Sequence, residues 1–71
     1  MELEVVAEDG QTGYYRLHQQ PQDMGVEAGI FPIPSPVGWF RLEVNDRDIG
    51  IYPTFAEARA ALDQYVQEQE K

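Results

Sequence analysis

The absence of cysteine from a chain of only 71 residues is the feature that most limits what it can fold into. Without cysteine there is no disulfide and no cysteine–metal site to stabilise a small fold. A single apolar core in a domain of this size rarely contributes more than about 3–5 kcal/mol. Leu, Ile, Val and Phe make up 17 residues, above the roughly 20% below which a charged chain is expected to stay disordered. The sequence therefore predicts one domain over residues 1–71, held together by dense aromatic packing or by a partner.

Alternation of apolar and polar residues predicts two β-strands in the N-terminal part, over residues 2–8 and 14–19. Leu3, Val5 and Ala7 share one side of the first strand, and Tyr15 and Leu17 share one side of the second. Residues 9–13 contain two glycines and are typical of a turn. We expect the two strands to form an antiparallel hairpin.

Residues 20–37 interrupt this alternation with four prolines and two glycines. The composition predicts a long loop, because proline and glycine disfavour the interior of helices and strands. Its centre, residues 30–36, is expected to be extended and stiff. A loop of this length in a small domain is often functional, and we expect it either to fold over the sheet or to bind a partner.

The C-terminal half predicts two more strands, over residues 38–44 and 48–52, and a helix over residues 55–69. Thr54 and Glu57 have the spacing of a capping box at the start of this helix. The order β-β-loop-β-β-α predicts an α+β fold, in which the helix packs on one face of a small antiparallel sheet of about four strands. The expected core consists of Leu3, Val5, Tyr15, Leu17, Phe40, Leu42, Val44, Ile49, Ile51, Phe55, Leu62 and Val66.

Few side chains are suited to catalysis. His18, Ser35 and Lys71 are each the only residue of their type, and no set of nucleophile, base and orienting group can be assembled from them. Asp46 and Glu57 stand at the first and twelfth positions of a calcium-loop-like string, but its sixth position is isoleucine and not glycine. We expect no enzymatic activity, no metal and no other cofactor.

Residues 39–58 resemble a known strand-turn-strand-helix pattern. The segments WFRLEV (39–44) and GIYPTFAEA (50–58) are similar to the pattern W-x-x-x-x-x…G-x-[FY]-x-T-x-x-E-A. This pattern occurs in the arm-binding domains of tyrosine recombinases, in ethylene-response DNA-binding domains of plants and in some small antitoxins. The resemblance covers about 25 of the 71 residues. It implies a nucleic-acid-binding module that places Trp39, Arg41 and Arg47 on the sheet.

The formal net charge of −8 favours another class of partner. Protein–DNA affinity depends on Lys and Arg contacts to phosphate, so direct nucleic-acid binding is disfavoured. An acidic surface instead suits a basic protein, such as one that itself binds nucleic acid. In size and charge the chain is similar to small phage inhibitors, including some anti-CRISPR proteins and a uracil-DNA glycosylase inhibitor. The N-terminal residues lack the pattern of a secretory signal, and we expect a cytoplasmic protein that does not enter membranes.

Aromatic side chains accompanied by arginine are typical of interface anchors. Trp39 is out of phase with Phe40, so a regular strand would place it on the sheet face away from the helix. We expect this face and the loop 20–37 to bind a partner through Tyr14, Arg16, Trp39, Arg41, Ile30, Phe31 and Ile33. The leading hypothesis is thus a non-enzymatic domain that binds, and inhibits or regulates, a basic nucleic-acid-binding protein. The alternatives are the recombinase-arm-like module and a small accessory protein that associates with itself, for example as a homodimer.

Overall fold

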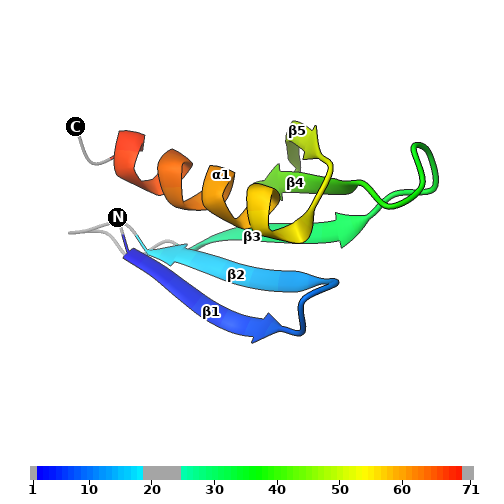
Figure 1. Ribbon diagram of the computed structural model, residues 1–71. Helices are drawn as coiled ribbons and strands as arrows, with labels where there is room; N and C mark the ends of the chain where they lie inside the picture. The colour runs from blue at the N-terminus through cyan, green and yellow to red at the C-terminus, as the bar shows by residue number, and fades with distance from the viewer. Residues whose placement is uncertain (1, 19–24, 70–71) are drawn as a thin grey trace.

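The computed structural model describes residues 2–18 and 25–69 and has an α+β fold. Five antiparallel strands lie in the order β1-β2-β3-β4-β5, and one helix packs across a single face of the sheet (Figure 1). The predicted fold class is confirmed, with five strands in place of about four. The elements are β1 (Glu2–Glu8), β2 (Gly13–His18), β3 (Val26–Pro32), β4 (Phe40–Val44), β5 (Arg47–Tyr52) and α1 (Phe55–Gln69).

The central strand β3 corrects the prediction of an unbroken loop over residues 20–37. Residues 26–32 pair with β2 on one side and with β4 on the other. Proline is tolerated because Pro32 is the last residue of the strand, where a missing N–H interrupts no further pairing. Residues 20–24, which fall in the same predicted loop, lie outside the described part. The hairpin loop that remains covers residues 33–39, contains a cis Ser35–Pro36 peptide bond and projects beyond the sheet (Figure 1).

The two short turns follow from their sequences. Asp9 Oδ1 accepts hydrogen bonds from the backbone N–H groups of Gln11 (2.9 Å) and Thr12 (2.7 Å), while Gly10 adopts a φ of 89°. The β4–β5 turn places Asn45 and Asp46 at φ values of 53° and 63°, as a two-residue turn of type I′ requires. The turn at residues 9–13 was predicted from its two glycines.

Irregular pairing at both edge strands changes which side chains face the helix. The β1–β2 register shifts between Val5 and Ala7, and the β4–β5 register shifts beside Ile49, the signature of a β-bulge with one extra residue. Ile51 lies opposite Arg41 and therefore faces away from α1. Three predicted core residues are wrong, because Val5, Ile49 and Ile51 are 48%, 38% and 41% exposed. The bulge in β5 accounts for Ile49 and Ile51, whereas Val5 is paired with Tyr15 on the helix side and is exposed at the edge of the sheet.

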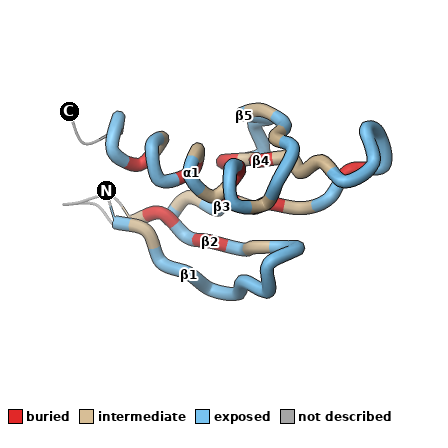
Figure 2. Tube along the Cα trace, viewed as in Figure 1, coloured by how far each residue is buried: buried red, intermediate tan, exposed pale blue. Residues whose placement is uncertain are grey.

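The core lies between the sheet and α1, along the buried segments of Figure 2. Leu3, Phe40, Tyr52 and Phe55 are only partly buried and pack against it. The Phe40 and Phe55 rings meet edge to face with centroids 5.8 Å apart. The core cluster itself consists of Tyr15, Leu17, Ala28, Ile30, Leu42, Val44, Ala58, Leu62 and Val66.

Helix α1 begins as predicted. The Thr54 Oγ1 atom accepts a hydrogen bond from the Glu57 backbone N–H at 3.1 Å, which satisfies one of the free donors of the first turn. The predicted limits of the helix, residues 55 and 69, are confirmed. In the part of the chain that the structure describes, no helix has the length and apolar character needed to cross a membrane.

A polar cluster ties α1 to the edge strand β1. Arg59 Nε donates to Glu8 Oε2 at 3.1 Å, and a second Arg59 nitrogen, Nη1, pairs with Asp63 on the next helical turn. The same Glu8 oxygen accepts a 2.6 Å hydrogen bond from the hydroxyl of Tyr15, and the Arg59 guanidinium lies 5.2 Å from the centroid of the Tyr15 ring. The bulge in β1 turns Glu8 toward the helix side, and this orientation lets Glu8 contact Arg59 and Tyr15.

Candidate functional site

The face of the sheet opposite α1, called here the open face, is not covered by any other described helix or strand (Figure 1). Directly opposed residues in an antiparallel pair point to the same side, so the register gives the composition of this face. The open face carries Glu2, Glu4, Ala7, Tyr14, Arg16, His18, Glu27, Gly29, Phe31, Arg41, Glu43, Asp48 and Ile51. It combines aromatic and apolar side chains with charges of both signs, the acidic ones being more numerous.

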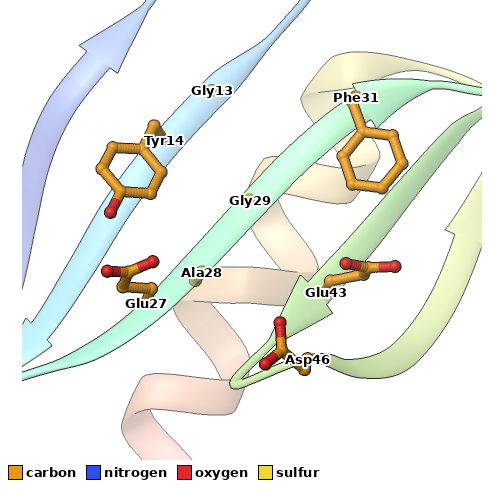
Figure 3. Close-up of a pocket in the computed structure, with 8 residues that line it drawn as sticks. All are labelled: Gly13, Tyr14, Glu27, Ala28, Gly29, Phe31, Glu43 and Asp46. Carbon is orange, nitrogen blue, oxygen red and sulfur yellow. The ribbon is translucent and has the colours of Figure 1, made fainter.

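A hollow with a volume of about 270 Å³ lies at the centre of the open face. Gly29 is its floor, because it stands between Tyr14 on β2 and Glu43 on β4 and has no side chain of its own. The Tyr14 and Phe31 rings flank this floor (Figure 3). The lining is completed by Gly13, Glu27, Ala28, Glu43 and Asp46.

Three carboxylates surround the hollow. Figure 3 shows Glu27 on the side of Tyr14, toward which the tyrosine hydroxyl points, and Glu43 and Asp46 on the other side. The ion pairs among the described residues join Asp48 to Arg41, and Glu8 and Asp63 to Arg59. Glu4 lies 2.6 Å from His18 Nε2, a contact that is an ion pair only when the histidine is protonated. None of these pairs uses a carboxylate of the hollow. Arg16 stands opposite Glu27 across the β2–β3 pair, so Glu43 and Asp46 carry most of the negative charge that lacks a nearby cation within the described part of the chain.

Arg41 also lies on the open face, opposite Phe31, and it has a defined partner in Asp48. Its Nε atom lies 3.4 Å from Asp48 Oδ2, is buried, and has no hydrogen bond of good geometry. Asp48 stands directly opposite Glu43 across the β4–β5 pair, and like charges in that position repel. Arg41 therefore offsets the charge of Asp48 and leaves that of Glu43 directed toward the hollow.

The structure brings together only part of the predicted partner-binding set. Tyr14 and Phe31 line the hollow, and Arg16 and Arg41 lie on the same face. Ile30 is fully buried on the helix side and Ile33 is also buried, so neither side chain belongs to the open face.

Trp39 lies just before β4 and is half-buried. Its backbone closes the hairpin loop, since its N–H donates to the Pro36 carbonyl at 3.2 Å and its carbonyl accepts from the Ile33 N–H at 3.1 Å. A position outside the strand is not governed by strand alternation. The role of Trp39 as an anchor stays a prediction.

The floor and the carboxylates of the hollow were missed because they lie on, or beside, the strand that was interpreted as loop. A signal was present in the sequence: Val26, Ala28 and Ile30 alternate with Glu27 and Gly29, the period of two that is typical of a strand. The position of Asp46 relative to β3 depends on long-range pairing that no local pattern reveals.

The groups considered for catalysis lie apart from the hollow. His18 Nε2 and Glu4 Oε1 are 2.6 Å apart between β2 and β1, and Ser35 is exposed in the hairpin loop. Among the described residues there is no group of three or more His, Asp or Glu side chains arranged to hold a metal ion. The arrangement on the open face is suited to binding.

Comparison of the chain with protein-family models, with curated proteins and with solved structures gives no match.

Proposed function

We propose that this protein is a binding domain that uses the open face of its sheet to engage a basic protein partner. The observation that supports this most directly is the hollow over Gly29. Two aromatic rings and three carboxylates that form no ion pair with another described residue surround a surface that no other described element covers. Buried or half-buried aromatic anchors surrounded by polar groups are typical of protein interfaces.

Charge supports a basic partner over a neutral one. The net charge is −8, and complementary fields raise association rates and exclude wrongly charged partners. Many strongly basic protein surfaces are those that bind nucleic acid. Occupation of such a surface by this chain would exclude the nucleic acid, which makes inhibition or regulation of a nucleic-acid-binding protein the proposed outcome.

A capture experiment with matched variants tests the proposal. The full chain is immobilised, exposed to an extract of its native host at low salt and washed with rising salt. We expect a basic nucleic-acid-binding protein to be retained and to be released by nucleic acid in competition. Glu43→Gln on the open face should weaken retention, whereas Glu68→Gln, the same charge change on an exposed residue of α1, should not. Retention that both variants reduce equally, or no retention at low salt, would contradict the proposal.

A gel-shift titration tests the alternative that the protein is a recombinase-arm-like module that binds nucleic acid directly. On the open face, Arg16 stands opposite both Glu4 and Glu27, and Arg41 pairs with Asp48. Carboxylates in these positions repel phosphate. We expect no retardation of duplex DNA at low ionic strength with protein in the tens of micromolar, and clear retardation there would favour the alternative.

A further inference from the structure

We propose that the hollow over Gly29 receives a single arginine side chain of the partner. This inference rests on the proposed function and deepens it, because it names the group that the open face recognises. The occupant is a guanidinium group on a flexible stem, presented by a protein segment that lies across the sheet.

The walls of the hollow suit a flat cation. Tyr14 is the neighbour of Gly29 on β2, and Phe31 follows Gly29 by two residues on β3, so the two rings stand on either side of the same floor (Figure 3). The face of an aromatic ring attracts a cation, and a planar guanidinium also stacks on it. Each ring can thus contact the stem or the head of an arginine that enters between them.

The carboxylates are arranged for several hydrogen bonds to one extended group. Glu27 lies on the side of Tyr14, while Glu43 and Asp46 lie across the hollow (Figure 3). They are spread around it and do not form a group that could hold a metal ion. A guanidinium carries five N–H donors in a rigid fork, so it can reach carboxylates on two sides at once.

Lysine fits this arrangement less well. Its ammonium group is a compact and strongly hydrated charge without a planar surface to stack between rings. It would satisfy the carboxylates on one side of the hollow and remain distant from the other. The combination of two rings and divided carboxylates therefore favours arginine.

A titration with short peptides tests the inference on the intact chain. The probe is acetyl-Gly-Arg-Gly-amide, added to ¹⁵N-labelled protein and followed by NMR. The expected result is saturable shifts confined to Gly13, Gly29, Phe31 and their neighbours. The lysine analogue should bind several-fold more weakly, and the citrulline analogue, which keeps the shape and loses the charge, should cause no saturable shifts. Shifts that do not saturate, or that are equal for arginine and citrulline, would overturn the inference.

Two variants separate occupancy of the hollow from damage to the fold. Gly29→Val fills the floor, and its Cβ has room because the nearest atom is the Gly13 carbonyl oxygen at 3.7 Å. Glu43→Gln keeps the shape and removes one carboxylate charge. Each is expected to raise the dissociation constant for the arginine peptide about tenfold, the equivalent of one charge-assisted contact. The control Glu68→Gln on α1 should leave it unchanged, and the amide spectrum of each variant shows directly whether it is folded.

The results also distinguish this inference from the proposed function. If the arginine peptide fails to bind while the captured partner is still lost on Glu43→Gln, the open face binds a basic protein by another group and the inference is wrong. If the peptide binds in the hollow and no basic partner is captured at low salt, arginine recognition stands and the proposed function is wrong.

Discussion

At the scale of single residues, two glycines in this sheet each lie beneath a tyrosine two positions further along the same strand. A Cβ built on Gly13 would lie within 2.6 Å of Tyr15 Cε2, and one built on Gly50 would lie 3.0 Å from the Tyr52 hydroxyl. Neither glycine is required by a positive φ. Space requires glycine at position 13, because the Tyr15 ring folds back over the backbone there, whereas at position 50 the Tyr52 side chain would have to move by only a few tenths of an ångström.

Gly13→Ala is accordingly expected to destabilise the protein by about 1–3 kcal/mol, the usual cost of overpacking. The ring of Tyr15 is fully buried, so it cannot move without disturbing the core and its 2.6 Å hydrogen bond to Glu8. Urea unfolding measures the effect. Gly29→Ala in the neighbouring strand is the control, since its new Cβ has room; equal losses for the two variants would show that the Tyr15 ring is not the cause.

Asp46 combines a strained backbone with a place in the hollow. The left-handed conformation costs an ordinary L-residue about 1–2 kcal/mol, and glycine avoids this cost but loses about 0.4–1 kcal/mol through the greater freedom of its unfolded chain. Asp46→Gly should therefore stabilise the protein by about 0.5 kcal/mol while it weakens binding of the arginine peptide. Denaturation measures the change in stability, and NMR titration of the same sample measures the change in binding of the arginine peptide. A variant that is less stable than the native chain and binds the arginine peptide equally well would contradict both roles of Asp46.

Trp39 and Phe40 are adjacent in sequence and are expected to respond differently to truncation. Phe40 packs against the Phe55 ring and the core, so Phe40→Ala should cost about 3 kcal/mol of stability. Trp39→Ala should leave most of the stability and weaken partner binding by about 2 kcal/mol if it is an anchor. Paired melting and binding measurements decide between the two roles. An equally severe loss of stability in both variants would place Trp39 among the structural residues.

At the scale of elements, the sequence predicts best where several signals coincide. The helix over residues 55–69 was predicted correctly because a capping pair, an apolar stripe and a preceding proline all point to the same start. β3 was missed because the prolines at 32, 34 and 36 outweighed an alternation of only five residues. The bulges in β1 and β5 are invisible to a strict period of two, and the one in β5 accounts for the wrong assignments of Ile49 and Ile51. Val5 does face the helix side, opposite Tyr15, but it lies on an edge strand and stays exposed.

The candidate site was predictable only in its aromatic part. Tyr14 and Phe31 stand out as apolar residues out of phase with the core, or in a segment that had no other role. Glu27, Glu43 and Asp46 belong to three different elements or turns, and only the pairing of β3 with β4 brings them together. Such long-range pairing is decided by the whole fold, and no local pattern encodes it.

The Tyr15 hydroxyl, which donates to Glu8 in the polar cluster between α1 and β1, predicts that the protein loses stability at high pH. Burial raises the pKa of Tyr15 above its ordinary value, and the hydrogen bond to Glu8 and the charge of Glu8 raise it further. Since the folded-state pKa is the higher one, the stabilisation is complete below the ordinary value of 10.0 and is lost as the pH rises toward the folded-state pKa. Urea unfolding at a series of pH values should show this decline, and Tyr15→Phe should flatten it. The same slope in the variant and the native chain would exclude Tyr15 as its origin.

At the scale of the whole molecule, the net charge of −8 acts on folding and on binding in opposite ways. Salt screens repulsion between like charges, with a Debye length that falls from about 30 Å at 0.01 M to about 8 Å at 0.15 M. We expect this increase in NaCl to raise the melting temperature by about 4–8 °C, the equivalent of about 1 kcal/mol in a domain of this size, while it weakens binding to a basic partner. Glu68→Lys, which changes the net charge from −8 to −6, should reduce the thermal effect. A melting temperature that falls with salt would contradict the expectation.

The bulges at the two borders of the sheet also limit how copies of this chain can join. A border strand recruits another chain by offering hydrogen-bonding groups at an even spacing, which is how sheets grow into fibrils. Here both borders have one extra residue that breaks this spacing, and β1 adds three glutamates that repel a second copy. Neither edge strand, β1 or β5, is therefore a good template for pairing with a strand of another copy. The domain can leave an apolar and aromatic sheet surface uncovered for a partner without polymerising through its margins.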